Sequence, residues 1–259
     1  MTVELQALAE LLAPWLWAGA LVALRIGAAV FLLPGFGAQA VPMRIRIALT
    51  VALTLIVAPA VAVPQPFAET DFGTFAAALA SETVTGLCLG FVVRLTIWIL
   101  QILGTIAAQS TSLSQILGAA AVDPQPAISQ VFVVAGLALA MMAGFHTRIV
   151  ASLIESYTLV PLGTLPLLSG MTGWAVDEVT SAFALAFSLA APFAIASLLY
   201  NMALGAINRA MPQLMVAFVG APAITAGGLA LLALAAPLIL TLWLDRLDQA
   251  LAFPLGAPR

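Results

Sequence analysis

The sequence predicts an all-α, polytopic membrane protein. Hydrophobic residues make up 63% of the 259 residues, charged residues make up 7%, and the mean hydropathy is +1.16. A soluble globular domain carries about 25% charged residues because its surface meets water. This chain has too little charge to cover a water-facing surface, and we therefore expect lipid or other protein to cover most of it.

Six stretches are apolar enough to cross a bilayer as helices, which takes about 20 mostly apolar residues. They are 11–33, 42–63, 72–103, 127–145, 179–204 and 213–244. Five prolines lie in or at the ends of these stretches: Pro34, Pro59, Pro192, Pro222 and Pro237. Each removes a backbone hydrogen bond and can kink its helix. We therefore expect about six kinked helices in one membrane-embedded domain, residues 1–259, with no soluble domain.

The connections between these stretches do not orient the chain in the membrane. The stretch 160–178 is rich in proline and glycine, and we interpret it as a loop too broken for a straight span. Cytoplasmic loops usually carry the excess of basic residues. Six spans would distribute the flanking arginines equally, with Arg44, Arg46 and Arg209 on one side and Arg148, Arg246 and Arg259 on the other. The tie suggests that some of the helices do not face lipid.

Two arginines lie within apolar stretches. Arg25 is in the first and Arg94 in the third, and neither has an acid one turn away on its own helix. A charge at the centre of a bilayer costs about 2.5–3.5 kcal/mol on insertion scales. Their partners must come from another helix, another subunit or the lipid headgroups, and snorkelling to the interface is the alternative to a specific contact.

A polar, mostly uncharged segment follows the third stretch. Residues 107–126 read AAQSTSLSQILGAAAVDPQP, and Asp123 is the first charge in them. Hydroxyl and amide groups without charge suit a segment that is packed inside protein or touches confined water, although an ordinary polar loop remains an equal alternative. Asp123 before Pro124 is typical of a helix N-cap.

No set of residues for catalysis, metal binding or a cofactor converges in this sequence. His146 is the only histidine and Cys88 the only cysteine, so neither a metal cluster nor a disulfide can form from them. Coupled carriers usually place acids near the bilayer midplane. Glu82 and Glu155 are the nearest candidates, and we expect both near helix ends. The net charge of −3 gives no reason to expect nucleic acid as a partner.

Three stretches resemble the FliR/SctT family of export-gate membrane proteins of flagellar and type III secretion systems. Residues 204–228, LGAINRAMPQLMVAFVGAPAITAGG, are similar to the family's signature region. Residues 24–59 resemble its first two helices, including Arg25, Pro34 and Arg44. Residues 146–163 resemble a segment that runs from a histidine to a Pro-x-Gly motif and includes Glu155. The resemblance covers nearly the whole chain in the same order.

The resemblance implies an all-helical fold that looks like a FliP-like part joined to a FliQ-like part. It implies FliP-like and FliQ-like subunits and an FlhB-like switch protein as partners, unfolded proteins as export substrates, and a place among the lipids of the bacterial inner membrane at the flagellar basal body. It further implies a pore plug, for which the candidates are Gln109, Ser112, Ser114, Gln115 and Gly118. The candidate assembly contacts are Arg25, Arg44, Arg94, Glu155, Asn208, Arg209, Pro212 and Gln213.

Two other functions stay open at this point. In a small-molecule or anion transporter with broken helices, the same prolines and arginines would form the substrate site. An intramembrane hydrolase would need a nucleophile and a base, which the sequence does not bring together. The choice between a flagellum and a virulence secretion system is also open.

Overall fold

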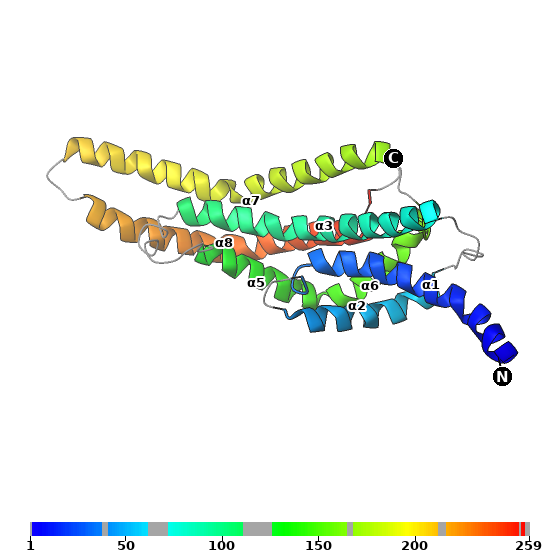
Figure 1. The fold of residues 1–259 in the computed structure, drawn as a ribbon. Helices are drawn as coiled ribbons and strands as arrows, with labels where there is room; N and C mark the ends of the chain where they lie inside the picture. Colours follow the sequence, from blue (N-terminus) through cyan, green and yellow to red (C-terminus); the bar gives the residue numbers. More distant parts are fainter. Residues whose placement is uncertain are drawn as a thin grey trace. The chain divides into compact units, whose positions relative to one another are not determined.

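The computed structural model describes residues 2–37, 41–61, 72–110, 126–164, 168–211, 216–253 and 255–256. Within those residues all regular structure is helical (Figure 1). The elements are α1 (Thr2–Leu32), α2 (Met43–Val57), the short 3₁₀ helix η1 (Ala58–Ala60), α3 (Phe72–Ser110), α5 (Ala127–Met142), α6 (Phe145–Leu159), α7 (Leu168–Ala210) and α8 (Val216–Ala252). The predicted all-α class is therefore confirmed.

Five helices in the described part of the chain are long and apolar enough to cross a membrane. They contain the spans Pro14–Leu32, Met43–Ala60, Gly73–Ser110, Met171–Ala210 and Pro222–Ala252. The pair α5 and α6 would make a sixth if it counts as one broken span. The break lies at Gly144, whose φ of 85° is a left-handed conformation that favours glycine. The prediction of a polytopic membrane protein with about six apolar helices is confirmed.

The structure corrects the sequence interpretation in two places, the start of α7 and the presence of α6. Residues 160–178 were interpreted as a loop, but α7 begins at Leu168 and continues through the second half of that stretch. Gly173 is helical there because an interior glycine costs a helix only about 1 kcal/mol. The sequence interpretation also left out α6. Its buried residues recur at the spacing of a helix face, which is the signal that could have found it: Ile149, Ser152, Leu153, Ser156 and Tyr157.

The chain divides by packing into two compact units, and the long helices α3, α7 and α8 each belong in part to both. The first unit contains Met1–Leu95, Ala143–Glu178 and Leu247–Arg259. In it α1 lies against α3 at two glycines. A Cβ on Gly86 would meet the backbone oxygen of Arg25, and a Cβ on Gly90 would lie 2.7 Å from the backbone oxygen of Ala29. The Gly86-x-x-x-Gly90 spacing thus allows the close helix contact expected of small residues.

The second unit contains Thr96–Met142 and Val179–Arg246. Trp243 of α8 is fully buried, and its indole N–H donates to the backbone oxygen of Thr96 on α3 at 2.7 Å. Gly104 of α3 lies against the backbone of Ser129 on α5, where a Cβ would not fit. The Tyr200 hydroxyl on α7 donates to the backbone oxygen of Gly220 on α8 at 2.6 Å.

Candidate functional site

The largest fully buried charged side chain in the described residues is Arg25, on the apolar helix α1. The side chain has 0% exposure and lies among apolar residues of the first unit. Two of its N–H groups bind the Glu82 carboxylate on α3: Nε donates to Oε2 at 2.7 Å, and Nη2 donates to Oε1 at 3.0 Å. Glu82 is also 0% exposed. This two-bond geometry matches the planar guanidinium to the carboxylate.

The end of α6 and the turn after it supply the other partners. Nη1 of Arg25 donates to the Ser156 hydroxyl at 3.2 Å, and Nη2 donates to the Val160 backbone oxygen at 3.0 Å. The guanidinium carbon lies 3.7 Å from the centroid of the Tyr157 ring. A desolvated cation–π contact of this kind adds about 2 kcal/mol. Arg25 therefore joins α1, α3 and α6.

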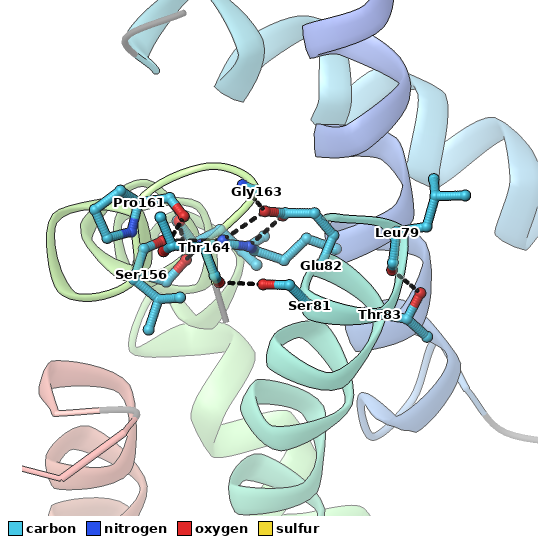
Figure 2. A network of polar contacts seen from close by, with 11 residues as sticks. Leu79, Ser81, Glu82, Thr83, Ser156, Pro161, Gly163 and Thr164 are labelled. Carbon is cyan, nitrogen blue, oxygen red and sulfur yellow. Dashed lines mark hydrogen bonds and ion pairs between the residues drawn. The ribbon is translucent and has the colours of Figure 1, made fainter. Parts of the chain in front are cut away.

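Glu82 is held from the other side by the turn 161–164. Figure 2 shows its carboxylate reaching toward Gly163, whose backbone N–H donates to Oε1 at 2.8 Å. The neighbouring Ser81 hydroxyl donates to the Thr164 backbone oxygen (Figure 2). Gly163 has a φ of 74°, a conformation that L side chains rarely adopt. We call Arg25, Glu82, Ser156, Tyr157 and Gly163 the Arg25 network.

The Arg25 network connects three helices of the first unit. A buried ion pair gains little net stability, but removal of one partner leaves an uncompensated charge and costs about 3–5 kcal/mol. The pair therefore favours one mutual arrangement of α1, α3 and α6. Within the described ranges, no group of three or more histidine, cysteine, aspartate or glutamate side chains could hold a metal ion.

The structure answers where the partner of Arg25 lies. The partner was expected on another helix, on another subunit or among the lipid headgroups, and it is Glu82 on another helix of the same chain. The Arg25 side chain has no exposed surface that could contact a second subunit or a headgroup. Glu82 was expected near a helix end, but it lies well inside α3. Sequence reasoning missed it as a partner because the two residues are 57 positions apart. The sequence did contain a signal for the pair. Glu82 is an acid within one apolar stretch, and Arg25 is a base within another.

Arg94 differs from Arg25 although both lie on apolar helices. Its side chain is half-buried on α3, and within the described residues it makes no hydrogen bond or ion pair. Arg44 lies in the first turn of α2 and Glu155 on α6, and both side chains are exposed. These three predicted assembly residues are thus available to a partner.

The last turns of α7 carry the predicted residues Asn208 and Arg209. Both are exposed, and every residue from Gly205 to Ala210 is exposed as well. Within the described part of the chain this helix end stays uncovered, and Ile207 on it is 46% exposed. Arg209 is in the last turn, where a cation is favoured by the helix dipole. Pro212 and Gln213 lie outside the described residues.

The predicted plug falls mostly outside the described residues. Gln109 is exposed near the end of α3. The other four candidates lie in the stretch 111–125, of which the structure describes nothing: Ser112, Ser114, Gln115 and Gly118.

Two cavities bear on the transporter alternative. One of about 430 Å³ lies in the second unit between α7 and α8, and its lining contains Ser110, Ser197 and Tyr200 but no charged residue. Another of about 250 Å³ lies between α1 and α2 and has Arg46 as its one charged lining residue. The larger cavity lacks the cation that an anion site needs, and neither cavity contains Arg25 or Arg94.

Comparison with known proteins gives a consistent result. The family model described as bacterial export proteins, family 1, matches residues 16–250. The chain is 33% identical over 237 residues to the flagellar biosynthetic protein FliR of Caulobacter vibrioides, which covers 91% of this chain and 94% of that protein. It is 29% identical to FliR of Escherichia coli over 83% of each chain. It is 28% identical to FliR of Bacillus subtilis over 78% of this chain and 79% of that one.

Proposed function

Because the chain belongs to the FliR family of bacterial export proteins, we propose that it is an export-gate subunit of the flagellar type III secretion apparatus. It works in the bacterial inner membrane at the flagellar basal body. It assembles there with FliP-like and FliQ-like subunits and an FlhB-like switch protein, and the assembly forms and seals the channel for unfolded export substrates. The role is structural rather than enzymatic, and the two packed units act as one membrane-embedded domain, residues 1–259.

The observation that carries the assembly role is the uncovered end of α7. Apolar side chains and polar groups lie there together, since Ile207 and Met211 are exposed beside Asn208 and Arg209. Lipid would cover the apolar groups but leave the amide and the guanidinium without partners, which hydrocarbon penalises. A neighbouring polypeptide covers both kinds of group. Pro212 and Gln213 continue this contact, and Arg44, Arg94 and Glu155 make further ones.

Arg25 serves assembly indirectly. Its guanidinium holds α1, α3 and α6 together from inside, so the surfaces that contact other subunits keep their shape. The plug is proposed to run from Gln109 through Ser112, Ser114, Gln115 and Gly118. Uncharged hydroxyl and amide groups suit a seal because they hydrogen-bond to confined water or protein without attracting ions.

A flagellar machine is preferred over a virulence system. The three relatives described above all have the name flagellar biosynthetic protein FliR, and the similarity covers most of each chain. The transporter alternative is not supported by the larger cavity, which is lined without charge.

Affinity purification from native membranes tests the proposal. A tagged copy of the full chain is expected to recover FliP-like and FliQ-like subunits after mild detergent extraction, and deletion of the gene is expected to abolish flagella and the secretion of flagellar proteins. A tagged chain that purifies alone while flagella still assemble in the deletion strain would disprove the role. Solute transport by the purified chain in liposomes would support the transporter instead.

A further inference from the structure

The helix α3 has the largest buried share of the candidate spans. Its apolar window is 61% buried inside the chain, against 11% for the spans of α2 and α8. Between Leu89 and Ser110, the positions that are not fully buried recur at intervals of three and four residues and so lie on one face of the helix; Trp98 and Gln109 are exposed there and the others are half-buried. We call them the α3 stripe: Phe91, Arg94, Trp98, Gln101, Ile102, Thr105, Ile106, Gln109 and Ser110.

The polarity of the α3 stripe is the reverse of what lipid requires. The half-buried and exposed positions carry most of the polar side chains, namely Arg94, Gln101, Thr105, Gln109 and Ser110. Over the same stretch Thr96 is the one polar side chain among the buried positions. A face exposed to hydrocarbon should be more apolar than the interior, because a polar group in lipid has no water to bond to. The α3 stripe is therefore not a lipid-facing surface.

Three of these polar side chains have no partner among the residues that the structure describes. The Thr105 and Ser110 hydroxyls donate to the backbone oxygens of Gln101 and Ile106 one turn earlier, each at 2.8 Å. In contrast, the Arg94 guanidinium and the Gln101 and Gln109 amides make no hydrogen bond within the described ranges. A cation and two amides on one face of a helix require a polar surface opposite them.

We propose that the α3 stripe docks an apolar helix of another subunit, and that this helix presents a carboxylate to Arg94 and hydrogen-bonding groups to Gln101 and Gln109. The inference rests on the proposed function, since it supplies the chemistry of one partner in the assembly. The charge requires an acid: a lone guanidinium at a protein interface away from water is stable only when it is paired. Arginine also selects a carboxylate by its planar set of donors.

Position along α3 argues against a lipid headgroup as the partner of Arg94. No charged residue occurs in 83–93 before it or in 95–110 after it. At about 1.5 Å per residue these uncharged stretches are roughly 16 and 24 Å long. Each is at least as long as half of a hydrocarbon core about 30 Å thick. A headgroup phosphate at either surface is therefore out of reach for the guanidinium when Arg94 lies near the middle of the bilayer.

Photocrosslinking in native membranes identifies what covers the α3 stripe. A benzoylphenylalanine replaces Trp98, which lies one turn from Arg94 and is 39% exposed. Irradiation is expected to join the chain to another subunit, at a peptide within an apolar helix that contains aspartate or glutamate. Adducts with lipid alone, adducts with a helix that has no acid, or no adduct would each overturn the inference.

Charge exchange then tests the contact itself. Arg94→Glu is expected to lower recovery of the crosslinked subunit at least about tenfold, because two carboxylates would face each other. Replacement of the partner's acid by arginine should restore recovery in the Arg94→Glu background to within about threefold. The matched control is the double variant Arg148→Glu with Asp248→Arg, which exchanges the charges of an exposed pair within the chain; recovery should stay within about twofold. Failure of the exchange to restore recovery would contradict a direct pair.

A second crosslinking position separates this inference from the proposed function. Benzoylphenylalanine at Ile207 samples the exposed end of α7. If position 207 captures export-gate subunits and position 98 captures none, the assembly role stands and the α3 stripe is not an interface. If neither position captures an export-gate subunit, the proposed function itself fails.

Discussion

Two arginines on apolar helices of this chain have opposite surroundings. Arg25 has no exposed surface and bonds to Glu82, Ser156 and Val160 of its own chain. Arg94 is half-buried and has no partner within the described residues. A guanidinium on an apolar helix is thus hydrogen-bonded inside the chain at Arg25, and it has no partner within the described residues at Arg94. On the proposal made above, the contrast separates the part of the molecule that is complete alone from the part that needs a neighbour.

Removal of the Glu82 carboxylate should give the largest effect. Glu82→Ala leaves Arg25 buried and unpaired, and we expect the free energy of unfolding in detergent to fall by about 3–5 kcal/mol. The double variant Arg25→Met with Glu82→Leu should recover most of this loss because no charge remains buried. Glu155→Ala is the control: its carboxylate lies exposed on α6, and we expect a change of at most about 0.5 kcal/mol. Equal losses in Glu82→Ala and Glu155→Ala would contradict the importance of the network.

The close approach of α1 to α3 gives the next effect. In Gly86→Ala the new methyl group meets the backbone oxygen of Arg25 and the Cβ of Ala28. We expect a loss of about 1–3 kcal/mol in thermal unfolding, since backbone atoms must move apart. Gly19→Ala on α1 is the matched control, because nothing lies within 4 Å of the added Cβ. It should be neutral or stabilising by about 0.5–1 kcal/mol, and a loss as large as that of Gly86→Ala would reject close packing as the cause.

The aromatic ring beside Arg25 sharpens the comparison further. Tyr157→Leu removes the cation–π contact, and we expect a loss of about 1–2 kcal/mol. Tyr157→Phe retains the ring and removes a buried hydroxyl that has no hydrogen-bond partner in the described part of the chain. This variant should match the unchanged protein or exceed its stability. A loss in Tyr157→Phe equal to that in Tyr157→Leu would mean that the hydroxyl, and not the ring, matters.

The smallest effect on the isolated chain is expected at Arg94. Arg94→Leu should change its free energy of unfolding by no more than about 0.5 kcal/mol, since the side chain makes no bond to the described part of the chain. The same variant should insert into the membrane normally and recover less of the FliP-like subunit in co-purification. Recovery at the normal yield would argue against Arg94 as an assembly contact. A stability loss as large as that of Glu82→Ala would remove the distinction between the two arginines.

The sequence by itself determined the fold class and the residues that needed explanation. Its apolar stretches predicted the membrane helices because any segment crossing lipid must satisfy its own backbone. Its rare charges identified Arg25 and Arg94 because such groups are expensive there. It did not find α6, and it gave 160–178 as a loop where α7 begins at Leu168, because the short amphipathic pattern and the glycines are weak signals in so apolar a chain.

Only the tertiary structure decided which arginine is satisfied. The Arg25–Glu82 pair joins residues 57 positions apart, and no periodicity in the sequence encodes such a distance. The pair forms because Gly86 and Gly90 let α1 and α3 approach and because Gly163 turns a backbone N–H toward the carboxylate. Arg94 lies on the same helix as Glu82, but on a face that the described residues cover only in part. Local chemistry set the cost of each charge, and the packing of distant helices determined which charge found a partner.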